Sequence, residues 1–333
     1  MQYPWLDTFI HWLKIDSTSG DEAEFLEALE KYFVAEGYTA QRQPVEEGRW
    51  NLLLTTSESP KALFSTHVDT VPPFFGPKIE DGKVFARGAC DTKGGIVAMA
   101  EAGRRLKDAG HLAHGYLFVV GEEVDHCGAK ASVTLSVQTD QIILCEPTVN
   151  QVVKAQKGMV KLELRAAGVA GHSAFPDRGE SAIEKLLVVL ERIRSHEWPT
   201  NEILGPTTIN VGVIEGGVAA NVFAPSARAE LLIRAVSPVE PLMETLRELS
   251  AGNCEISFPA SNDPVFFEIP DDVSHTIVPF NTDATYLSEL GPVWLVGPGD
   301  IQTAHSDHEH IVLDELERGI ELYERLALRV LNA

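Results

Sequence analysis

Acidic and histidine residues occur in five short stretches that together could bind metal ions and move a proton. Imidazole and carboxylate groups are common ligands of zinc and related ions, and a further carboxylate can serve as a general base. The ordered set supplies enough groups for both tasks, so it predicts a two-metal hydrolase. In chain order the stretches are His67-Val-Asp69, Asp91-Thr-Lys-Gly-Gly95, Glu122-Glu123, Glu146 and His305-Ser-Asp-His-Glu309.

The first stretch follows an apolar run, residues 62–66, that is typical of a buried strand. Residues at positions i and i+2 of a strand share a face, so His67 and Asp69 can point into one pocket. Asp69 is placed to orient His67 by bonding to the second ring nitrogen. A surface histidine and aspartate after a strand is the alternative interpretation.

Asp91 precedes a predicted helix, residues 93–107, and two glycines that allow a tight turn. Its carboxylate could bridge two cations, or it could only cap the helix. The neighbouring Cys90 could be a ligand, but packing against apolar residues explains it better.

Three acidic residues follow two further apolar strands, residues 116–120 and 141–145. Because neighbours on an extended chain point in opposite directions, Glu122 and Glu123 are expected to divide two roles, metal binding and proton transfer. Glu146 lies just after the second strand and is a further candidate ligand. Without the other ligands, solvated surface acids would explain these residues equally well.

Several histidines compete for the remaining ligand position. His305, His308 and His310 follow the Gly297-Pro-Gly299 loop, and spacing alone does not select among them. The histidines expected to be ordinary surface residues are His111, His114, His126 and His275.

The composition describes a soluble protein that acts on small molecules. The 333 residues are 44% hydrophobic and carry a formal net charge of −22, which disfavours nucleic acid and anionic membranes as partners. The first seven residues lack signal-peptide features, and no apolar run is long enough to span a bilayer. The four scattered cysteines favour reduced thiols and a cytoplasmic location (Cys90, Cys127, Cys145 and Cys254).

Two domains are expected from the order of the predicted elements. Apolar strands that alternate with helices near both ends of the chain predict an α/β domain, with a mixed, mostly parallel sheet sandwiched by helices. The middle reads β-α-β-β-α-β, the order of a ferredoxin-like α+β domain. The predicted division is residues 1–156 and 262–333 for the metal-binding catalytic domain, with residues 157–261 inserted into it.

The chain resembles the di-zinc amidohydrolase family that contains acetylornithine deacetylase, succinyl-diaminopimelate desuccinylase, aminoacylase and carboxypeptidase G. The resemblance covers nearly the whole chain. It rests on residues 65–72 (STHVDTVP), 87–95 (RGACDTKGG), Glu122-Glu123, Glu146-Pro147, 170–174 (AGHSA) and Ala304-His305.

The resemblance implies a role for each residue of the metal cluster. His67 and Glu146 would bind one metal, Glu123 and His305 the other, and Asp91 both. The family pattern of a histidine followed four positions later by Glu309 is what selects His305. Glu122 would be the general base and Asp69 the acid that orients His67. The two metals would be Zn²⁺, with Co²⁺ or Mn²⁺ also suited to the ligands.

The resemblance also assigns the inserted domain a role in dimerisation and as a lid. His172 would stabilise the tetrahedral oxyanion, often from the partner subunit of a homodimer. Asn221 and Arg234 would bind the substrate carboxylate, for which a guanidinium offers two parallel donors. A structural role for His172, or a structural ion pair for Arg234, is the alternative.

Within the family, residues 280–284 (FNTDA) and 297–301 (GPGDI) look most like acetylornithine and acetylcitrulline deacetylases. The implied reaction is deacetylation of N-acetylornithine or N-acetylcitrulline, a step in arginine biosynthesis. Alternatives are hydrolysis of lysine or ornithine from an acidic carrier protein, and succinyl-diaminopimelate desuccinylation. A catalytically dead homologue that binds acylated amino acids is the non-enzyme alternative, although no ligand or base is replaced.

Overall fold

A computed structural model describes residues 3–56 and 59–333. Of the first seven residues, which lack signal-peptide features, the first two therefore lie outside the described residues. The chain forms two compact units. Unit 1 comprises Met1–Lys154, Phe267–Thr276 and Thr282–Ala333, and unit 2 comprises Ala155–Phe266 and Ile277–Asn281.

Unit 1 is built on a six-stranded sheet with the order β1-β2-β6-β3-β7-β17. The pairs β1–β2 and β2–β6 are antiparallel, whereas β6, β3, β7 and β17 run parallel to one another. The mixed α/β architecture predicted from the sequence is thus confirmed. The strands are β1 (Thr39–Glu46), β2 (Arg49–Thr55), β6 (His114–Val119), β3 (Ala62–His67), β7 (Gln141–Leu144) and β17 (Val293–Leu295).

Helices cover this sheet because its strands are apolar toward both faces. Phe64, Tyr116 and Phe118 pack into one core with residues of α1 (Leu6–Trp12), α2 (Ala23–Ala35), α3 (Lys93–Asp108) and α8 (Leu313–Leu331). The alternate residues Leu117 and Val119 are also fully buried. The short helices α4 (Cys127–Ser132) and α7 (Ala284–Leu287) contact each other, and α4 also contacts β1, β2 and β6.

Unit 1 also contains a small three-stranded sheet with the order β18-β5-β4. Its hairpin joins β4 (Lys78–Glu80) to β5 (Lys83–Phe85). Asp81 and Gly82 both have positive φ, as the Asp-Gly turn of such a hairpin requires. β18 (His310–Val312) pairs antiparallel with β5 and leads into α8.

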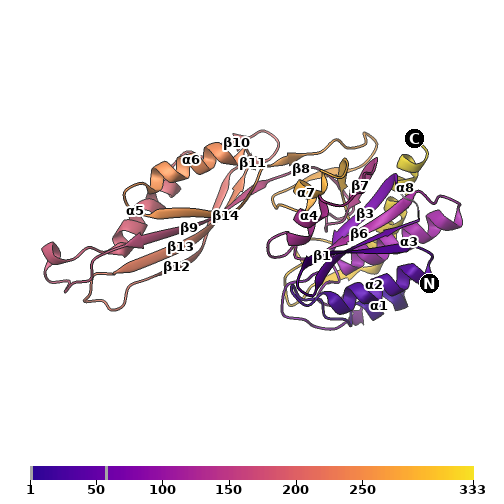
Figure 1. The fold of residues 1–333 in the computed structure, drawn as a ribbon, viewed down its shortest axis with the longest axis horizontal. Helices are drawn as coiled ribbons and strands as arrows, with labels where there is room; N and C mark the ends of the chain where they lie inside the picture. The colour runs from indigo at the N-terminus through magenta and orange to yellow at the C-terminus, as the bar shows by residue number, and fades with distance from the viewer. Residues whose placement is uncertain (1–2, 57–58) are drawn as a thin grey trace. The chain divides into compact units, whose positions relative to one another are not determined.

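Unit 2 has an antiparallel sheet with the order β12-β13-β9-β14, the strand order of a ferredoxin-like fold. Burial alternates along β9 and β13, so one face is covered, and α5 and α6 pack on it (Figure 1). Ser181 caps α5 by accepting from the Glu184 amide. The elements are β9 (Gly158–Ala167), α5 (Ala182–Ser195), β12 (Thr208–Gly216), β13 (Ser226–Ala235), α6 (Val239–Ser250) and β14 (Glu255–Asn262).

The remaining elements are short. A three-stranded sheet has the order β15-β8-β16, with β15 at Val265–Phe266, β8 at Val152–Gln156 and β16 at His275–Val278. The boundaries between the two units fall within or next to these strands. Unit 2 also holds the two-stranded pair β10 (Thr200–Asn201) and β11 (Gly205–Pro206), and a 3-10 turn, η1 (Pro176–Arg178).

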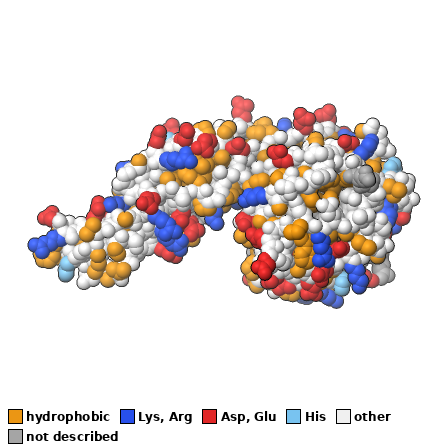
Figure 2. All heavy atoms as spheres, in the orientation of Figure 1, with side chains coloured by type: hydrophobic (Ala, Val, Ile, Leu, Met, Phe, Trp, Pro, Cys, Tyr) orange, Lys and Arg blue, Asp and Glu red, His pale blue; other side chains and the backbone are white. Residues whose placement is uncertain are grey.

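The surface reflects the acidic composition. Figure 2 shows Asp and Glu side chains distributed over the visible face, with Lys and Arg side chains between them. None of the helices in the described part of the chain has the length and apolar character needed to cross a membrane.

Candidate active site in unit 1

The candidate site is built where the parallel strands of the main sheet end. His67 is the last residue of β3, and Glu146 lies two positions after β7. Glu122 and Glu123 follow β6 after a short loop. Because β6, β3 and β7 run parallel, their carboxyl ends meet at one edge, where open α/β sheets bind ligands. Neighbouring strand order, rather than sequence proximity, brings these side chains together.

His67, Asp91 and Glu146 form the first group of potential metal ligands. Their ligating atoms all lie within 4.8 Å of one another, and all three residues are buried. His67 Nε2 is 3.0 Å from Asp91 Oδ1. On the other side of the ring, His67 Nδ1 is 2.9 Å from the Asp69 carbonyl oxygen and 3.5 Å from Asp69 Oδ1. Asp69 therefore contacts the ring nitrogen that faces away from Asp91, more closely through its carbonyl oxygen than through its carboxylate.

Asp91, Glu123 and His305 form the second group. His305 Nε2 lies 2.9 Å from Glu123 Oε1 and 3.3 Å from Asp91 Oδ2. The two oxygens of Asp91 thus face different histidines, Oδ1 toward His67 and Oδ2 toward His305. Asp91 is shared by both groups, which is the arrangement that a bridging carboxylate requires.

The electrostatics follow from packing carboxylates together in a buried place. Burial raises the pKa of Glu146 well above its ordinary value, and the nearby charges of Asp91 and Glu122 raise it further. Burial also opposes ionisation of Asp91, but hydrogen bonds from His305 and His67 outweigh it and hold its pKa below the usual range. Hydrogen bonds to Asp91 and Glu123 raise the pKa of His305 to about 10. Cations bound among these carboxylates would relieve their mutual repulsion.

The Glu122–Glu123 pair lies in a turn, so the expectation of an extended chain there is wrong. Both backbone amides donate to the Asp69 carboxylate, Glu122 to Oδ1 at 3.1 Å and Glu123 to Oδ2 at 3.2 Å. Ser19 Oγ also donates to Asp69 Oδ2, at 2.7 Å. The two glutamates still have different surroundings, since Glu123 contacts His305 and Glu122 lies near His126.

The three histidines of the tail are separated by the structure. His305 contacts Glu123 and Asp91, whereas His308 is exposed. His310 lies in β18, with its ring against Phe85. Only the first of these three therefore joins the cluster.

Glu309 and Arg87 support the loop that carries Asp91, and sequence reasoning did not find this role. Glu309 Oε1 accepts from the amides of Cys90 and Asp91, both at 3.1 Å. Its other oxygen accepts from Arg87 Nη1 at 2.6 Å, and both side chains are almost completely buried. In the sequence, Glu309 serves only to select His305 through the family pattern.

Two histidines expected at the surface are buried, which corrects the prediction for them. His114 lies in β6 with its Nε2 2.7 Å from Tyr38 Oη, so it is a core residue. His126 is 8% exposed, and its Nδ1 lies 2.8 Å from Asp283 Oδ1. A polar residue before a short helix looks solvated in the sequence, but the left-handed backbone of His126 turns its ring inward.

The other predicted site residues belong to unit 2. His172 is exposed, its backbone bridges to Val222, and its Nδ1 accepts from the Ala174 amide. The carbonyl of Asn221 accepts from the Ser173 amide, so His172 and Asn221 lie on adjoining segments. Arg234 is a half-buried residue of β13, opposite Thr208 in the neighbouring strand.

Comparison with known proteins identifies the class to which this fold and this set of side chains belong. Residues 63–329 match the model of Peptidase family M20/M25/M40, so the chain belongs to that family and is a hydrolase of the peptidase class. A Peptidase M20 domain-containing protein of Schizosaccharomyces pombe is 33% identical over 95% of this chain and 82% of its own length. A protein of Aspergillus terreus named "Probable carboxypeptidase" is 32% identical over 97% of this chain and 86% of its own length.

Solved structures share the fold along the whole chain. A tripeptidase from Staphylococcus aureus superposes with a TM-score of 0.83 and 22% identity, covering 99% of this chain and 98% of its own. A dinuclear metal binding peptidase of the M20 family from Bacillus subtilis has a TM-score of 0.73 and 13% identity, covering 98% of each chain. The fold and family are thus those predicted, whereas a special similarity to acetylornithine deacetylase is not among these findings.

Proposed function

We propose that this chain is a metal-dependent amidohydrolase that releases an amino acid from an N-acylated precursor. The observation that carries the proposal is the shared position of Asp91 between two groups of metal-ligating side chains. Glu122, a carboxylate outside both groups, lies beside them. Ligands for two cations and a separate base are the parts that hydrolysis of an amide needs.

The donor set fits two divalent cations. His67 and Glu146 would hold the first, Glu123 and His305 the second, and Asp91 both. Imidazole with carboxylate suits Zn²⁺, and Co²⁺ or Mn²⁺ would also be accommodated. Such ions, when bound, polarise an amide carbonyl and make water more acidic. The Bacillus subtilis relative, whose name describes a dinuclear metal binding peptidase, supports this reading.

Glu122 is the group proposed to move protons. Burial raises its pKa well above the ordinary value for glutamate, and the charges of Asp283, Glu123 and Asp91 add to the effect. A carboxylate with a raised pKa accepts a proton from water more readily and can then deliver it to the departing amine. Asp69 holds His67 in position through Nδ1, and it fixes the turn that carries Glu122.

Unit 2 is proposed to act as the dimerisation and lid domain. His172 would stabilise the oxyanion, and Asn221 with Arg234 would bind the substrate carboxylate. A homodimer through this unit is supported by the apolar side chains of β12 and α5 that are exposed in the monomer (Leu187, Val188, Val211 and Ile214). β12 is also an edge strand of its sheet, which leaves it open to pairing.

The substrate is proposed to carry a free carboxylate next to the scissile amide. A carboxypeptidase, the activity named for the Aspergillus terreus relative, also releases an amino acid with that carboxylate. Within this class N-acetylornithine and N-acetylcitrulline remain our first candidates. Carrier-linked lysine or ornithine and succinyl-diaminopimelate follow.

A substrate panel tests the proposal. The metal-loaded protein would be assayed with N-acetylornithine, N-acetylcitrulline, N-acetyl-lysine, succinyl-diaminopimelate, dipeptides and tripeptides, and ranked by kcat/KM. We expect an N-acyl amino acid to lead. A leading tripeptide would replace the proposed substrate class. Tight binding of acylated amino acids without turnover of any compound would instead support the non-catalytic homologue.

A further inference from the structure

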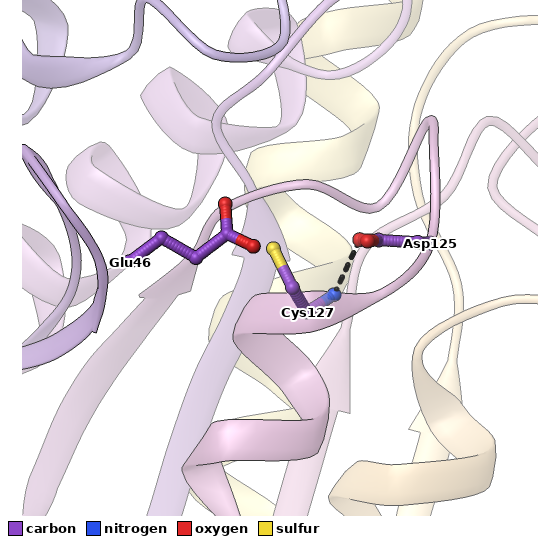
Figure 3. Close-up of side chains that lie close together, drawn as sticks. All are labelled: Glu46, Asp125 and Cys127. Atoms are coloured by element: carbon purple, nitrogen blue, oxygen red, sulfur yellow. Dashed lines mark hydrogen bonds between the residues drawn. The ribbon is translucent and has the colours of Figure 1, made fainter.

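Two further groups of potential metal ligands lie in unit 1 outside the two that share Asp91. One consists of Glu46, Asp125 and Cys127, and in Figure 3 the Glu46 carboxylate and the Cys127 thiol point toward each other. Arg49 Nη1 already pairs with Glu46 at 2.6 Å. Burial raises the pKa of Cys127 to about 12, so the thiol stays protonated at neutral pH and is a poor ligand. This group is an ion-pair cluster.

The other group consists of Glu122, His126 and Asp283, and its surroundings differ. His126 Nδ1 lies 2.8 Å from Asp283 Oδ1 and 3.7 Å from Glu122 Oε1. His126 is 8% exposed and Asp283 is 1% exposed, so water screens them little. When both carboxylates are ionised and the ring is neutral, the group carries a charge of −2, which one divalent cation would balance.

The spacing of these atoms is close to the spacing in the two groups that share Asp91. There, the distances from a histidine nitrogen to a carboxylate oxygen are 3.0 Å for His67 and 2.9 and 3.3 Å for His305. Donor atoms bound to a common zinc ion, each about 2.0–2.2 Å from it, lie about 3–3.5 Å apart. The distance of 2.8 Å between His126 and Asp283 is slightly shorter than this range, and the distance of 3.7 Å between His126 and Glu122 is slightly longer.

Asp283 supplies an independent indication that a ligand belongs here. Its second oxygen, Oδ2, is buried and has no hydrogen-bond partner among the described residues. An unsatisfied buried carboxylate oxygen is costly, and a bound ion is one explanation for such a group. The ligand atoms of Asp283, Glu122 and His126 all lie within 4.8 Å of one another.

The backbone holds this arrangement in place. His126 has φ of 60° and ψ of 29°, a left-handed conformation that residues with a side chain rarely adopt. It immediately precedes α4, and Asp283 immediately precedes α7, which contacts α4. Unusual backbone conformations persist where the surroundings fix them, and they cluster at functional sites.

We propose that Glu122, His126 and Asp283 form an additional binding site for a divalent cation, weaker than the two sites that share Asp91. An imidazole with two carboxylates suits zinc among the common biological cations. Its consequence rests on the proposed function, because an ion bound to Glu122 would occupy the carboxylate that accepts the proton. Excess zinc would therefore inhibit the enzyme.

Metal stoichiometry tests the site without any substrate. The protein, loaded with two equivalents of zinc, would be dialysed against buffered free Zn²⁺, and bound zinc measured by elemental analysis. We expect a third equivalent in the wild type and two in the His126→Asn and Asp283→Asn variants. Asparagine tolerates the left-handed backbone at position 126. The exposed His275 provides a matched control, and His275→Asn should retain the third equivalent.

Inhibition tests the consequence. Added zinc should inhibit the wild type and His275→Asn alike, and the half-inhibiting concentration should rise about tenfold or more in His126→Asn. Inhibition of equal strength in all three proteins would overturn the inhibitory role. A wild type that binds only two equivalents, or folded variants of both His126 and Asp283 that keep the third, would reject the site itself. Because dialysis needs no turnover, this result stands apart from any failure of the proposed reaction.

Discussion

The buried pair of Arg87 and Glu309 yields a prediction whose size can be worked out from the structure. The Arg87 side chain is 1% exposed and that of Glu309 0%. In Glu309→Gln the side-chain oxygen can still accept from the amides of Cys90 and Asp91, but an NH₂ group replaces the oxygen that faces Arg87 Nη1 at 2.6 Å. The guanidinium is left buried without a counter-charge. Breaking a buried pair in this way costs about 3–5 kcal/mol.

Thermal unfolding of the metal-loaded protein measures this cost. At about 2–4 °C per kcal/mol for a unit of this size, the midpoint should fall by about 6–20 °C. The double variant Arg87→Met/Glu309→Gln should be at least as stable as Glu309→Gln alone, because it removes the unpaired charge. Glu80→Gln is the matched control, since its pair with Lys78 is exposed, and we expect no measurable change.

Metal affinity is a second measurement on the same variants. Glu309 holds the backbone amide of Asp91, so a displaced loop should weaken metal binding by about 10–100-fold, the usual effect of losing a group that orients a ligand. A midpoint within 2 °C of the wild type would contradict the reasoning. So would a double variant much less stable than Glu309→Gln, since the cost would then not come from the unpaired charge.

The remaining predictions concern catalysis, the partner subunit, the metal and pH. Glu122→Gln should lower kcat by about 10²–10⁴-fold while zinc content at both sites is retained, as elemental analysis would check. Mixing His172→Ala with a Glu122→Gln variant should restore activity if the histidine acts across the dimer; no recovery despite proven subunit exchange would reject that role. Chelation should abolish turnover, and added zinc or cobalt should restore it. Burial lowers the pKa of Lys93 from 10.5 to about 7, so the unfolded state binds more protons in that interval and stability rises with pH. The unfolding free energy of the wild type minus that of Lys93→Met should therefore grow by about 2 kcal/mol between pH 7 and pH 9; a constant difference would contradict the lowered pKa.

The fold and the grouping of candidate ligands could be predicted from the sequence, because apolar runs show where the strands end. An apolar run followed by an acid or a histidine locates His67, Glu122 and Glu146, and parallel order then collects them at one edge. By contrast β1 was not predicted, since its polar sequence and Pro44 hide the alternation of a strand. The motifs give the amide chemistry and the substrate candidates of the family, whereas the choice among these candidates depends on the walls of the pocket, which the motifs do not include.

Contacts between residues that are far apart in the sequence could not be predicted from it. Arg87 and Glu309 are 222 positions apart, and His126 and Asp283 are 157 positions apart. Because the partners are so far apart, neither pair shows a local spacing from which it could be predicted. For this reason the sequence predicts a surface position for His126, although the residue is buried. A buried polar residue needs its partner to be recognised, and the partner is known only from the fold.

Asp69 explains how two adjacent glutamates can hold different roles. Its carboxylate accepts from the amides of Glu122 and Glu123, while its carbonyl oxygen lies against His67. One residue therefore fixes both the turn and the orientation of the first histidine. With the turn held at its backbone, Glu123 contacts His305, and Glu122 lies near His126 on another side. The proposed separation of metal ligand from base therefore rests on backbone geometry, since the two residues have the same side chain.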